Sequence, residues 1–332
     1  MKAVMREELI PSFNVQDVLI DPWAADFDIY VWILVMGFLV NLACGLVGNF
    51  IVVRRMALVG DAISHSVLPG LVIAFLFTGS FAISFMLLGA IVAGVLTTVL
   101  IEVIHKNSRI KTDAALGIVF SLFFAIGVIL INVYAGQVHL DAECVLYGEI
   151  NHMAEALPVV VGGIELAPVK IILMGTVTVA IVLLILVFYK ELLVTSFDPG
   201  LAQSLGIKVN HFHYGLMIVL SIVIVCAFES VGVILVIAML IFPATTSAMV
   251  SDRLSHILLL TFPLSLLYTI GGLHLALWLN TSISASMVVV AVFIFMLTWV
   301  FSPRRGVLTK LLASGKPNAA KQQVAPQGND LT

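Results

Sequence analysis

The sequence has few charged residues, and this scarcity limits the class of protein it can encode. Only 11% of the 332 residues are charged, whereas soluble domains carry about 25%. A chain of this length with so little charge cannot cover a water-exposed surface with polar side chains. The composition therefore excludes an ordinary soluble protein.

Several motifs are also missing. The sequence contains no GxxxxGK[ST] phosphate loop, so we do not expect this chain to hydrolyse ATP by the usual route. It has no soluble binding domain and no elbow motif that would position a serine nucleophile. The three cysteines form no CxxC pair, which favours small apolar fillers or a lone thiol. The first 29 residues lack the apolar core of a cleavable signal peptide. Any energy source or capture protein is therefore expected on other chains.

Apolar residues are abundant and occur in long blocks. They make up 61% of the sequence, and the mean hydropathy is +1.16. Each block is long enough to span a bilayer, which takes about 20 residues. The sequence predicts an all-α integral membrane protein with eight or nine transmembrane helices; Glu229 and Gly232 mark a join between two short or broken helices. The blocks lie near 30–53, 57–79, 81–104, 114–135, 169–189, 213–230, 231–250, 256–278 and 283–301.

Basic residues predict the orientation. Under simple alternation of nine crossings, every basic cluster in the loops falls on one side, which the positive-inside rule assigns to the cytoplasm. These clusters include Arg54, Arg55, Lys106, Arg109, Lys111, Lys190, Lys208, Arg253, Arg304 and Arg305. The division is then an N-terminal non-membrane segment (1–29), a transmembrane domain (30–302) and a disordered cytoplasmic tail (303–332). We expect a multi-pass protein of the bacterial inner membrane, with the N-terminus outside.

Two ionisable residues lie inside the second apolar block. Asp61 and His65 are four positions apart and share one face of a helix. Counting from Arg55 at about 1.5 Å per residue places them about 9 Å and about 15 Å into the bilayer core. A carboxylate and an imidazole at that depth suit a divalent ion such as Mn²⁺, Fe²⁺ or Zn²⁺. The alternative is an Asp–His hydrogen bond that joins two helices without any ion.

The residues around this pair resemble a known family. The run from Arg54 to Ser66, which includes Gly-Asp61-Ala-Ile-Ser-His65, is similar to the signature of ABC-3 permeases, the membrane subunits of manganese, zinc and iron ABC importers. Further segments match in order and extend the resemblance over about residues 30–302. They are Asp113–Ile118, Asp141–Glu149, Ser196–Pro199, Val231–Leu235 and Ile241–Ala244.

The resemblance implies a function and several partners. It implies the permease subunit of an ATP-driven importer that receives a divalent metal ion from an external metal-binding protein or lipoprotein. Asp61 and His65 would line the ion path as transient metal ligands. An ABC ATPase subunit, a second permease copy or paralogue and membrane lipids are the expected partners. No permanently bound cofactor and no nucleic acid is expected, because the metal ion is cargo.

A short segment after the fifth block has the signals of a helix outside the membrane. Asp198 suits the N-cap, Pro199 the first helical position, and Gly206 the end. Leu201 and Leu205 share a face. Spacing alone leaves an ordinary interfacial helix and an ATPase-coupling element equally open. The family resemblance favours coupling.

Weaker candidates lie on the outer side. Asp141 and Glu149 in the loop 136–168, and Glu229 at the helix break, are acids that would help to receive an ion. A solvated polar loop is the simpler interpretation of the first two.

Two other functions compete with the metal importer. A permease for iron-siderophore or cobalamin complexes must pass a large organic ligand and has less use for an Asp–His pair at mid-membrane. A secondary metal transporter in which the pair relays protons predicts an internal inverted repeat, but the Gly-Asp-Ala-Ile-Ser-His string occurs once. Asp and His serve manganese, zinc and iron alike, so the metal stays open.

Overall fold

Helices dominate the part of the chain that the computed structural model describes: residues 14, 16–79, 83–134, 150, 158–161, 164–302 and 306. Within these ranges eight helices are long and apolar enough to cross a membrane. The multi-pass all-helical prediction is confirmed. The elements are η2 (Gln16–Ile20), α1 (Asp21–Ala25), α2 (Phe27–Val53), α3 (Val59–Ser66), α4 (Leu68–Thr78), α5 (Ile83–Asn107), α6 (Thr112–Tyr134), β1 (Pro158–Val161), β2 (Ile164–Pro168), α8 (Val169–Val187), α9 (Tyr189–Phe197), α10 (Pro199–Ser204), α11 (Val209–Val250), α12 (Leu254–Leu279) and α13 (Ile283–Phe301).

Helix α11 contains the predicted break. Gly232 has φ 78 and ψ 166, far from helical values, and glycine accommodates this positive φ without steric cost. The break separates a membrane-length helix, Val209–Phe228, from a shorter apolar helix, Ile234–Val250. Each of the nine apolar blocks thus corresponds to a helix, and the seventh is the short one. Nine crossings stays a prediction for that helix.

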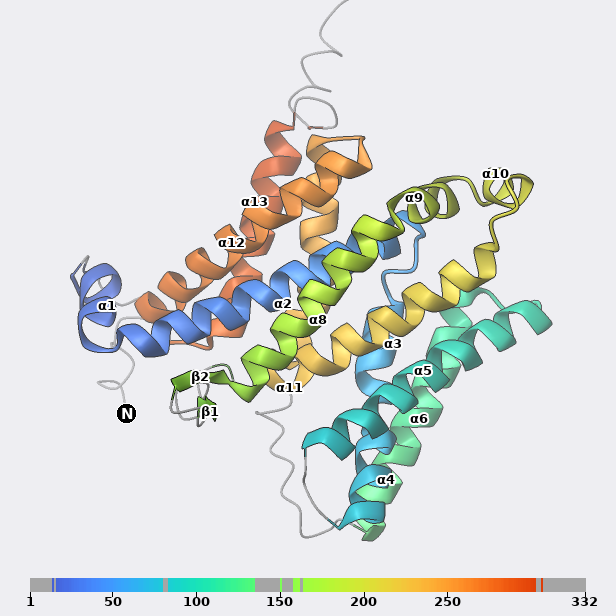
Figure 1. Cartoon of the computed structure of the whole chain (residues 1–332), viewed down its shortest axis with the longest axis horizontal. Coiled ribbons are helices and arrows are strands. Elements are labelled where there is room, and N and C mark those ends of the chain that lie inside the picture. Colours follow the sequence, from blue (N-terminus) through green and yellow to red (C-terminus); the bar gives the residue numbers. More distant parts are fainter. Residues whose placement is uncertain are drawn as a thin grey trace, which may run out of the picture.

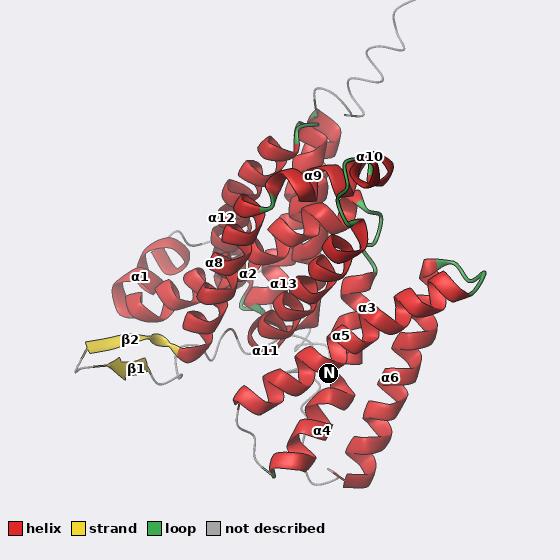
Figure 2. Cartoon of the chain, turned by 45° about the vertical axis from the view of Figure 1, so that its right-hand side comes forward, coloured by secondary structure: helices red, strands yellow, loops and turns green. Residues whose placement is uncertain are grey.

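The helices form two groups, which Figures 1 and 2 show side by side. The α3–α6 unit comprises α3, α4, α5 and α6. The scaffold comprises α2, α8, α11, α12 and α13. Helix α11 contacts α2, α12 and α13 within the scaffold, and it also packs against α3 and α5. Helix α11 therefore provides the main contact between the two groups.

Buried polar side chains join the scaffold helices. The Asn41 amide on α2 donates to Thr269 Oγ1 on α12 at 2.9 Å. Two turns further along α2, the Asn49 amide donates to Thr261 Oγ1 at 2.9 Å. These two pairs fit one antiparallel register between α2 and α12. Polar side chains inside a membrane are satisfied by such interhelical bonds, which also fix the register of the helices.

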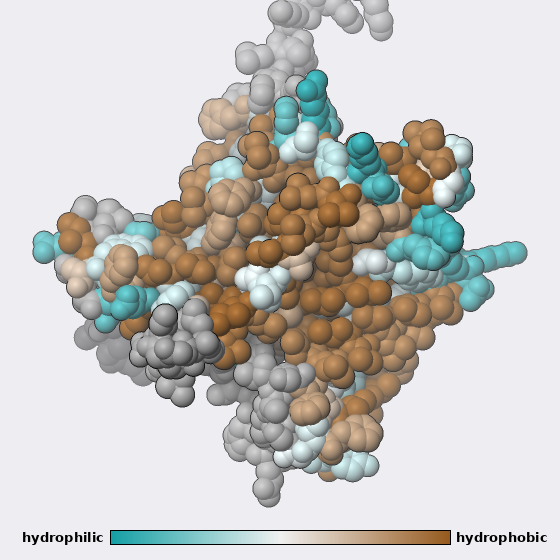
Figure 3. Space-filling view, in the orientation of Figure 1, coloured by the Kyte–Doolittle hydropathy of each residue, from teal (hydrophilic) through white to brown (hydrophobic). Residues whose placement is uncertain are grey.

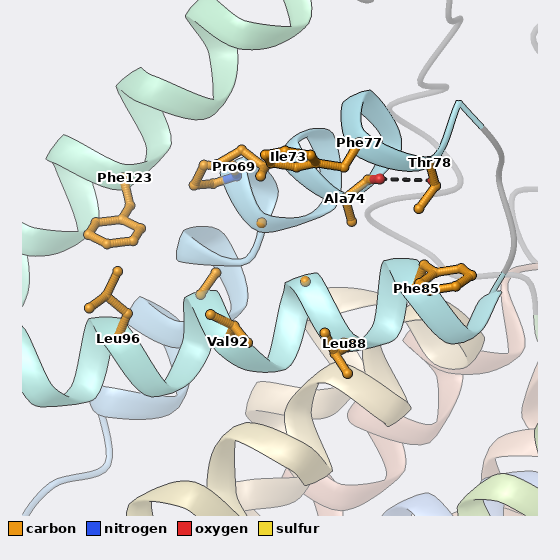
Figure 4. A pocket seen from close by; sticks show the side chains of 13 residues that line it. Pro69, Ile73, Ala74, Phe77, Thr78, Phe85, Leu88, Val92, Leu96 and Phe123 are labelled. Carbon is orange, nitrogen blue, oxygen red and sulfur yellow. Dashed lines mark hydrogen bonds between the residues drawn. The ribbon is translucent and has the colours of Figure 1, made fainter.

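Small residues hold α4 against α5. A Cβ atom added at Gly70 would clash with the Gly89 carbonyl oxygen, and one added at Gly89 would clash with the Gly70 carbonyl oxygen. Close approach through small residues is typical of membrane helices. Beside this crossing an apolar groove of about 340 Å³ opens between the two helices, with Pro69 and Phe77 on one wall and Leu88 on the other (Figure 4).

The two ends of the molecule differ from its apolar middle. Figure 3 shows a broad hydrophobic surface with hydrophilic residues gathered at the corners. α1 and the β1–β2 hairpin lie at one end, and α9 and α10 lie at the other (Figure 1). This distribution fits helices that cross a bilayer between two polar ends.

The hairpin differs from the prediction of a plain loop over 136–168. β1 and β2 pair antiparallel, with Val160 opposite Glu165. The run Pro158-Val-Val-Val161 explains the difference, because β-branched residues favour strands. At the N-terminus, α2 begins at Phe27, inside the segment 1–29. The predicted tail 303–332 lies outside the described residues apart from Gly306.

Candidate functional site

Asp61 and His65 form a pair on α3. His65 Nε2 lies 3.5 Å from Asp61 Oδ1, one helical turn away, so the predicted shared face is confirmed. The side chains are 35% exposed for His65 and 49% exposed for Asp61. The neighbouring Ile63 points to the other side and is fully buried. The pair therefore lies on an open face of the α3–α6 unit.

Helix α6 forms one wall beside the pair. The His65 ring lies 5.3 Å from the Phe120 ring and 6.1 Å from the Phe124 ring, measured between centroids. Gly117 lies one turn before Phe120 on α6, and a Cβ atom added there would meet nothing within 4 Å. Open space thus continues along this face of α6 toward the N-terminal end. The imidazole thus packs against the two aromatic rings on one side and stays partly exposed.

The described part of the chain gathers few metal ligands in one place. Among these residues, no group of three or more His, Cys, Asp or Glu side chains is placed to hold a metal ion. The pair on α3 offers one carboxylate and one imidazole. Two such donors would hold a divalent ion only weakly.

Helix α10 has the predicted local structure. The Leu201 backbone N–H donates to Asp198 Oδ1 at 2.9 Å, which makes Asp198 the N-cap, and Pro199 occupies the first turn. At the other end Gly206 has φ +79, and the Ile207 N–H returns to the Ala202 carbonyl at 3.0 Å. This is the Schellman pattern that ends helices.

The two leucines of this segment face outward. Leu201 is 49% exposed and Leu205 is 63% exposed, whereas Ala202 is fully buried. The segment projects at one corner of the molecule (Figure 1). Together the two leucines form a small apolar surface on a capped, rigid turn, and we call it the α10 surface.

The structure describes little of the three acids predicted on the outer side. Asp141 and Glu149 lie outside the described residues. Glu229 lies in α11, near the break at Gly232, but its side chain is outside the described part. Their role in receiving an ion stays a prediction.

Sequence reasoning missed a polar network at the end of the molecule that carries α10. Arg54, which follows α2, donates to Ser196 Oγ and Thr195 Oγ1 on α9, each at 3.2 Å. Its Nη1 also lies 3.5 Å from His213 Nδ1 on α11. His213 is mostly buried and joins Arg54 to Glu102 on α5.

A charged pair completes this network. Lys106 Nζ lies 2.8 Å from Glu102 Oε1, one turn further along α5. Burial lowers the pKa of the Arg54 guanidinium from its ordinary value, which reflects its shielding from water. The only sequence signal was local: Glu102 and Lys106 stand four apart at the end of an apolar block. The link to His213 spans 111 positions in the sequence and has no local signal.

Comparison with known proteins gives consistent matches over most of the chain. Residues 26–302 match the model of the ABC-3 family, described as the ABC 3 transport family. The chain is 44% identical over 281 residues to the manganese transport system membrane protein MntD of Bacillus subtilis, covering 85% of this chain and 95% of that protein. It is 39% identical over 280 residues to the zinc transport system membrane protein TroD of Treponema pallidum, covering 84% of this chain and 76% of the other.

A solved structure matches at the level of the fold as well. The structure of PsaBC from Streptococcus pneumoniae in complex with Fab aligns with a TM-score of 0.72 and 36% sequence identity. The alignment covers 88% of this chain and 98% of that chain.

Proposed function

The chain belongs to the ABC-3 transport family, and from this premise we propose that it is the permease subunit of an ATP-driven importer of divalent metal ions such as manganese, zinc or iron. The relatives named above are described as manganese and zinc transport membrane proteins. The observation that carries the proposal is the Asp61–His65 pair on an open face of a membrane helix.

The exposure of this pair favours an ion path over a structural hydrogen bond. A pair that only joined two helices would be enclosed by both, but Asp61 is 49% exposed on the isolated chain. A carboxylate facing lipid at mid-membrane is costly. The face is therefore covered by protein or lines a polar path in the working transporter.

A second permease copy or paralogue would complete the path. Two such chains facing each other across this surface would bring two carboxylates and two imidazoles together. Those four donors suit a borderline divalent ion. The site would remain transient, because each chain holds the ion through only two side chains.

The α10 surface is proposed as the contact for a separate ABC ATPase subunit. Leu201 and Leu205 are exposed apolar side chains on a capped turn outside the membrane helices. The ends of this turn are fixed by Asp198, Pro199 and Gly206. A displacement of α10 by the ATPase would therefore move α9 as well and would not be lost in a local change of the turn. The ATPase subunit supplies the energy, since this chain carries no phosphate loop.

The orientation follows from the same assignment. The end with α9 and α10 faces the cytoplasm of a bacterial inner membrane, and the N-terminus and the β1–β2 hairpin face outward. An external metal-binding protein or lipoprotein would deliver the ion there. Asp141, Glu149 and Glu229 are candidates to receive it.

Two competing functions find less support. A path for siderophore or cobalamin complexes would have no use for a half-exposed carboxylate beside an imidazole. A proton-driven secondary transporter would need no contact surface for a motor subunit. Uptake of free Mn²⁺, Zn²⁺ or Fe²⁺, and of a siderophore or cobalamin complex, by proteoliposomes that hold the native complex, purified through a tag on this chain, tests all three. We expect ATP-dependent uptake of Mn²⁺ or Zn²⁺; uptake driven by a proton gradient without ATP would refute the proposal.

A further inference from the structure

The Arg54 network, defined as Arg54, Thr195, Ser196, His213, Glu102 and Lys106, lies where the scaffold meets the α3–α6 unit. Its members come from the end of α2, the last turn of α9, the start of α11 and the end of α5. Four elements that are distant in sequence thus meet through side-chain hydrogen bonds. One of them, α9, leads directly into the α10 surface.

The hydrogen bonds assign a single neutral state to His213. The Arg54 guanidinium can only donate, so His213 Nδ1 accepts from it at 3.5 Å. His213 Nε2 then carries the proton and donates to Glu102 Oε2 at 3.2 Å. One ring therefore uses both its acceptor and its donor to join Arg54 to α5. The Glu102 and His213 side chains are 14% and 18% exposed, which shields these bonds from water.

A cavity adjoins the network. It has a volume of about 420 Å³ and is lined by residues that include Arg55, Met56, Pro199 and Asn210 besides members of the network. A tightly packed junction would fix one arrangement of side chains. Space beside these hydrogen bonds allows the Arg54 network to take a second arrangement.

The network connects to the Asp61–His65 pair in two ways. Arg54 opens the short connection that leads into α3, so its position sets where α3 begins. On α5, Gly94 lies two turns before Glu102 and packs against Ile63 of α3, where an added Cβ would lie 3.3 Å from Ile63 Cγ2. Ile63 lies between Asp61 and His65 in the sequence. A displacement of α5 would therefore reach α3 at the pair.

We propose that the Arg54 network couples the α10 surface to the ion path, with His213 as the positioning residue that links Arg54 to Glu102. The proposal rests on the function proposed above. When the ATPase displaces α10, the end of α9 moves with it. Thr195 and Ser196 move Arg54 through their hydrogen bonds to its guanidinium. His213, which is bonded to both Arg54 and Glu102, then transmits the displacement to α5. The α3–α6 unit then shifts relative to the scaffold and alters access to Asp61 and His65.

Two substitutions at one position test the linking role of His213. His213→Leu removes both hydrogen bonds, whereas His213→Gln offers one acceptor for Arg54 and one donor for Glu102. The native complex, purified through a tag on this chain and placed in proteoliposomes, is assayed for Mn²⁺ uptake and ATP hydrolysis. We expect uptake per ATP to fall about tenfold in His213→Leu, within the range usual for coupling between two sites. His213→Gln should restore most of it.

Two further variants guard against an effect on folding alone. His105→Leu removes an exposed histidine that bonds to the nearby Ile110 carbonyl, and it should leave uptake per ATP unchanged. Arg54→Lys keeps the charge but cannot hold Thr195, Ser196 and His213 at once, and it should uncouple as His213→Leu does. Arg54→Lys also tests the coupling role if His213→Leu fails to assemble.

The possible failures are distinguishable. Unchanged uptake per ATP in both His213→Leu and Arg54→Lys would overturn the coupling role. So would a loss of uptake and hydrolysis in proportion to the amount of assembled complex, because that pattern indicates packing only. If the unmodified complex takes up none of Mn²⁺, Zn²⁺ and Fe²⁺, the proposed function itself fails.

Discussion

The scaffold and the α3–α6 unit bury their polar groups differently. In the scaffold, Asn41 and Asn49 on α2 bond across to Thr269 and Thr261 on α12. In α3, the hydroxyls of Ser64 and Ser66 bond back to carbonyl oxygens of their own helix. Hydroxyls of the scaffold also bond within their own helices, as Ser265 does to the Thr261 carbonyl oxygen, so the difference lies in the added bonds between α2 and α12. Such interhelical bonds fix the register of the two helices.

The contrast concerns the polar residues and not the coverage of whole helices. The most apolar stretch of α2 is 67% buried, and that of the α3–α4 segment is 61% buried. Asn41 and Asn49 on α2 are buried, whereas Asp61 and His65 on α3 are 49% and 35% exposed. The scaffold, a frame whose amides are buried and paired, thus differs from the α3–α6 unit, which carries half-exposed ionisable side chains.

The largest expected effect comes from disrupting the packing of α2 against α11 in the scaffold. A Cβ atom at Gly48 on α2 would overlap the Leu240 carbonyl oxygen of α11, and backbone cannot move aside as a side chain can. Gly48→Val should therefore prevent assembly, with the folded complex reduced to a trace in detergent gel filtration. Gly215→Val on α11 is the matched control, because nothing lies within 4 Å of the added Cβ atom. Normal assembly of Gly48→Val would contradict the close packing of the frame.

The second largest effect concerns the α10 surface, where a substitution should lower coupling to the ATPase without lowering the stability of the permease. Replacing both Leu201 and Leu205 by Glu puts charge on the exposed α10 surface and should leave the membrane helices folded. Uptake should fall about tenfold or more through weaker coupling to the ATPase. Thermal unfolding of the permease in detergent should stay unchanged. Full uptake with normal ATPase retention would show that this surface has another role.

The smallest expected effect comes from removing the interhelical hydrogen bonds of Asn49 in the scaffold. Asn49→Leu removes the bond that Asn49 donates to Thr261 on α12 and the longer one that it accepts from Ser247 on α11. Such bonds contribute about 0.6 kcal/mol each on average in membrane proteins. We expect a slightly lower unfolding temperature and nearly normal uptake. Combining it with Thr261→Val should add little, because both changes remove the same bond. Independent, additive losses would mean that the two residues do not act together.

Local signals in the sequence predicted much of this structure. Apolar blocks located the helices, Gly232 marked the break in α11, and Asp198 with Gly206 bounded α10. Each of these features depends on a few neighbouring residues. The i and i+4 spacing of Asp61 and His65 likewise fixed their shared face.

Features that depend on the packing of distant segments were not predictable. The exposure of Asp61 depends on which helices cover its face, and no periodicity determines this. The bond between His213 and Glu102 joins residues 111 positions apart. The short β1–β2 hairpin lies in a segment predicted as loop, because strands of four and five residues give little periodic pattern.

Metal uptake by Asp61→Asn tests the central claim most directly. Asparagine keeps the size and hydrogen bonding of aspartate but removes its charge. A carboxylate and a cation in contact at an effective dielectric constant near 20 interact by about 4 kcal/mol or more, so uptake should fall at least about 100-fold. The amount of assembled complex should stay normal. Near-normal uptake by the assembled Asp61→Asn complex would contradict the role of Asp61 as a ligand in the ion path.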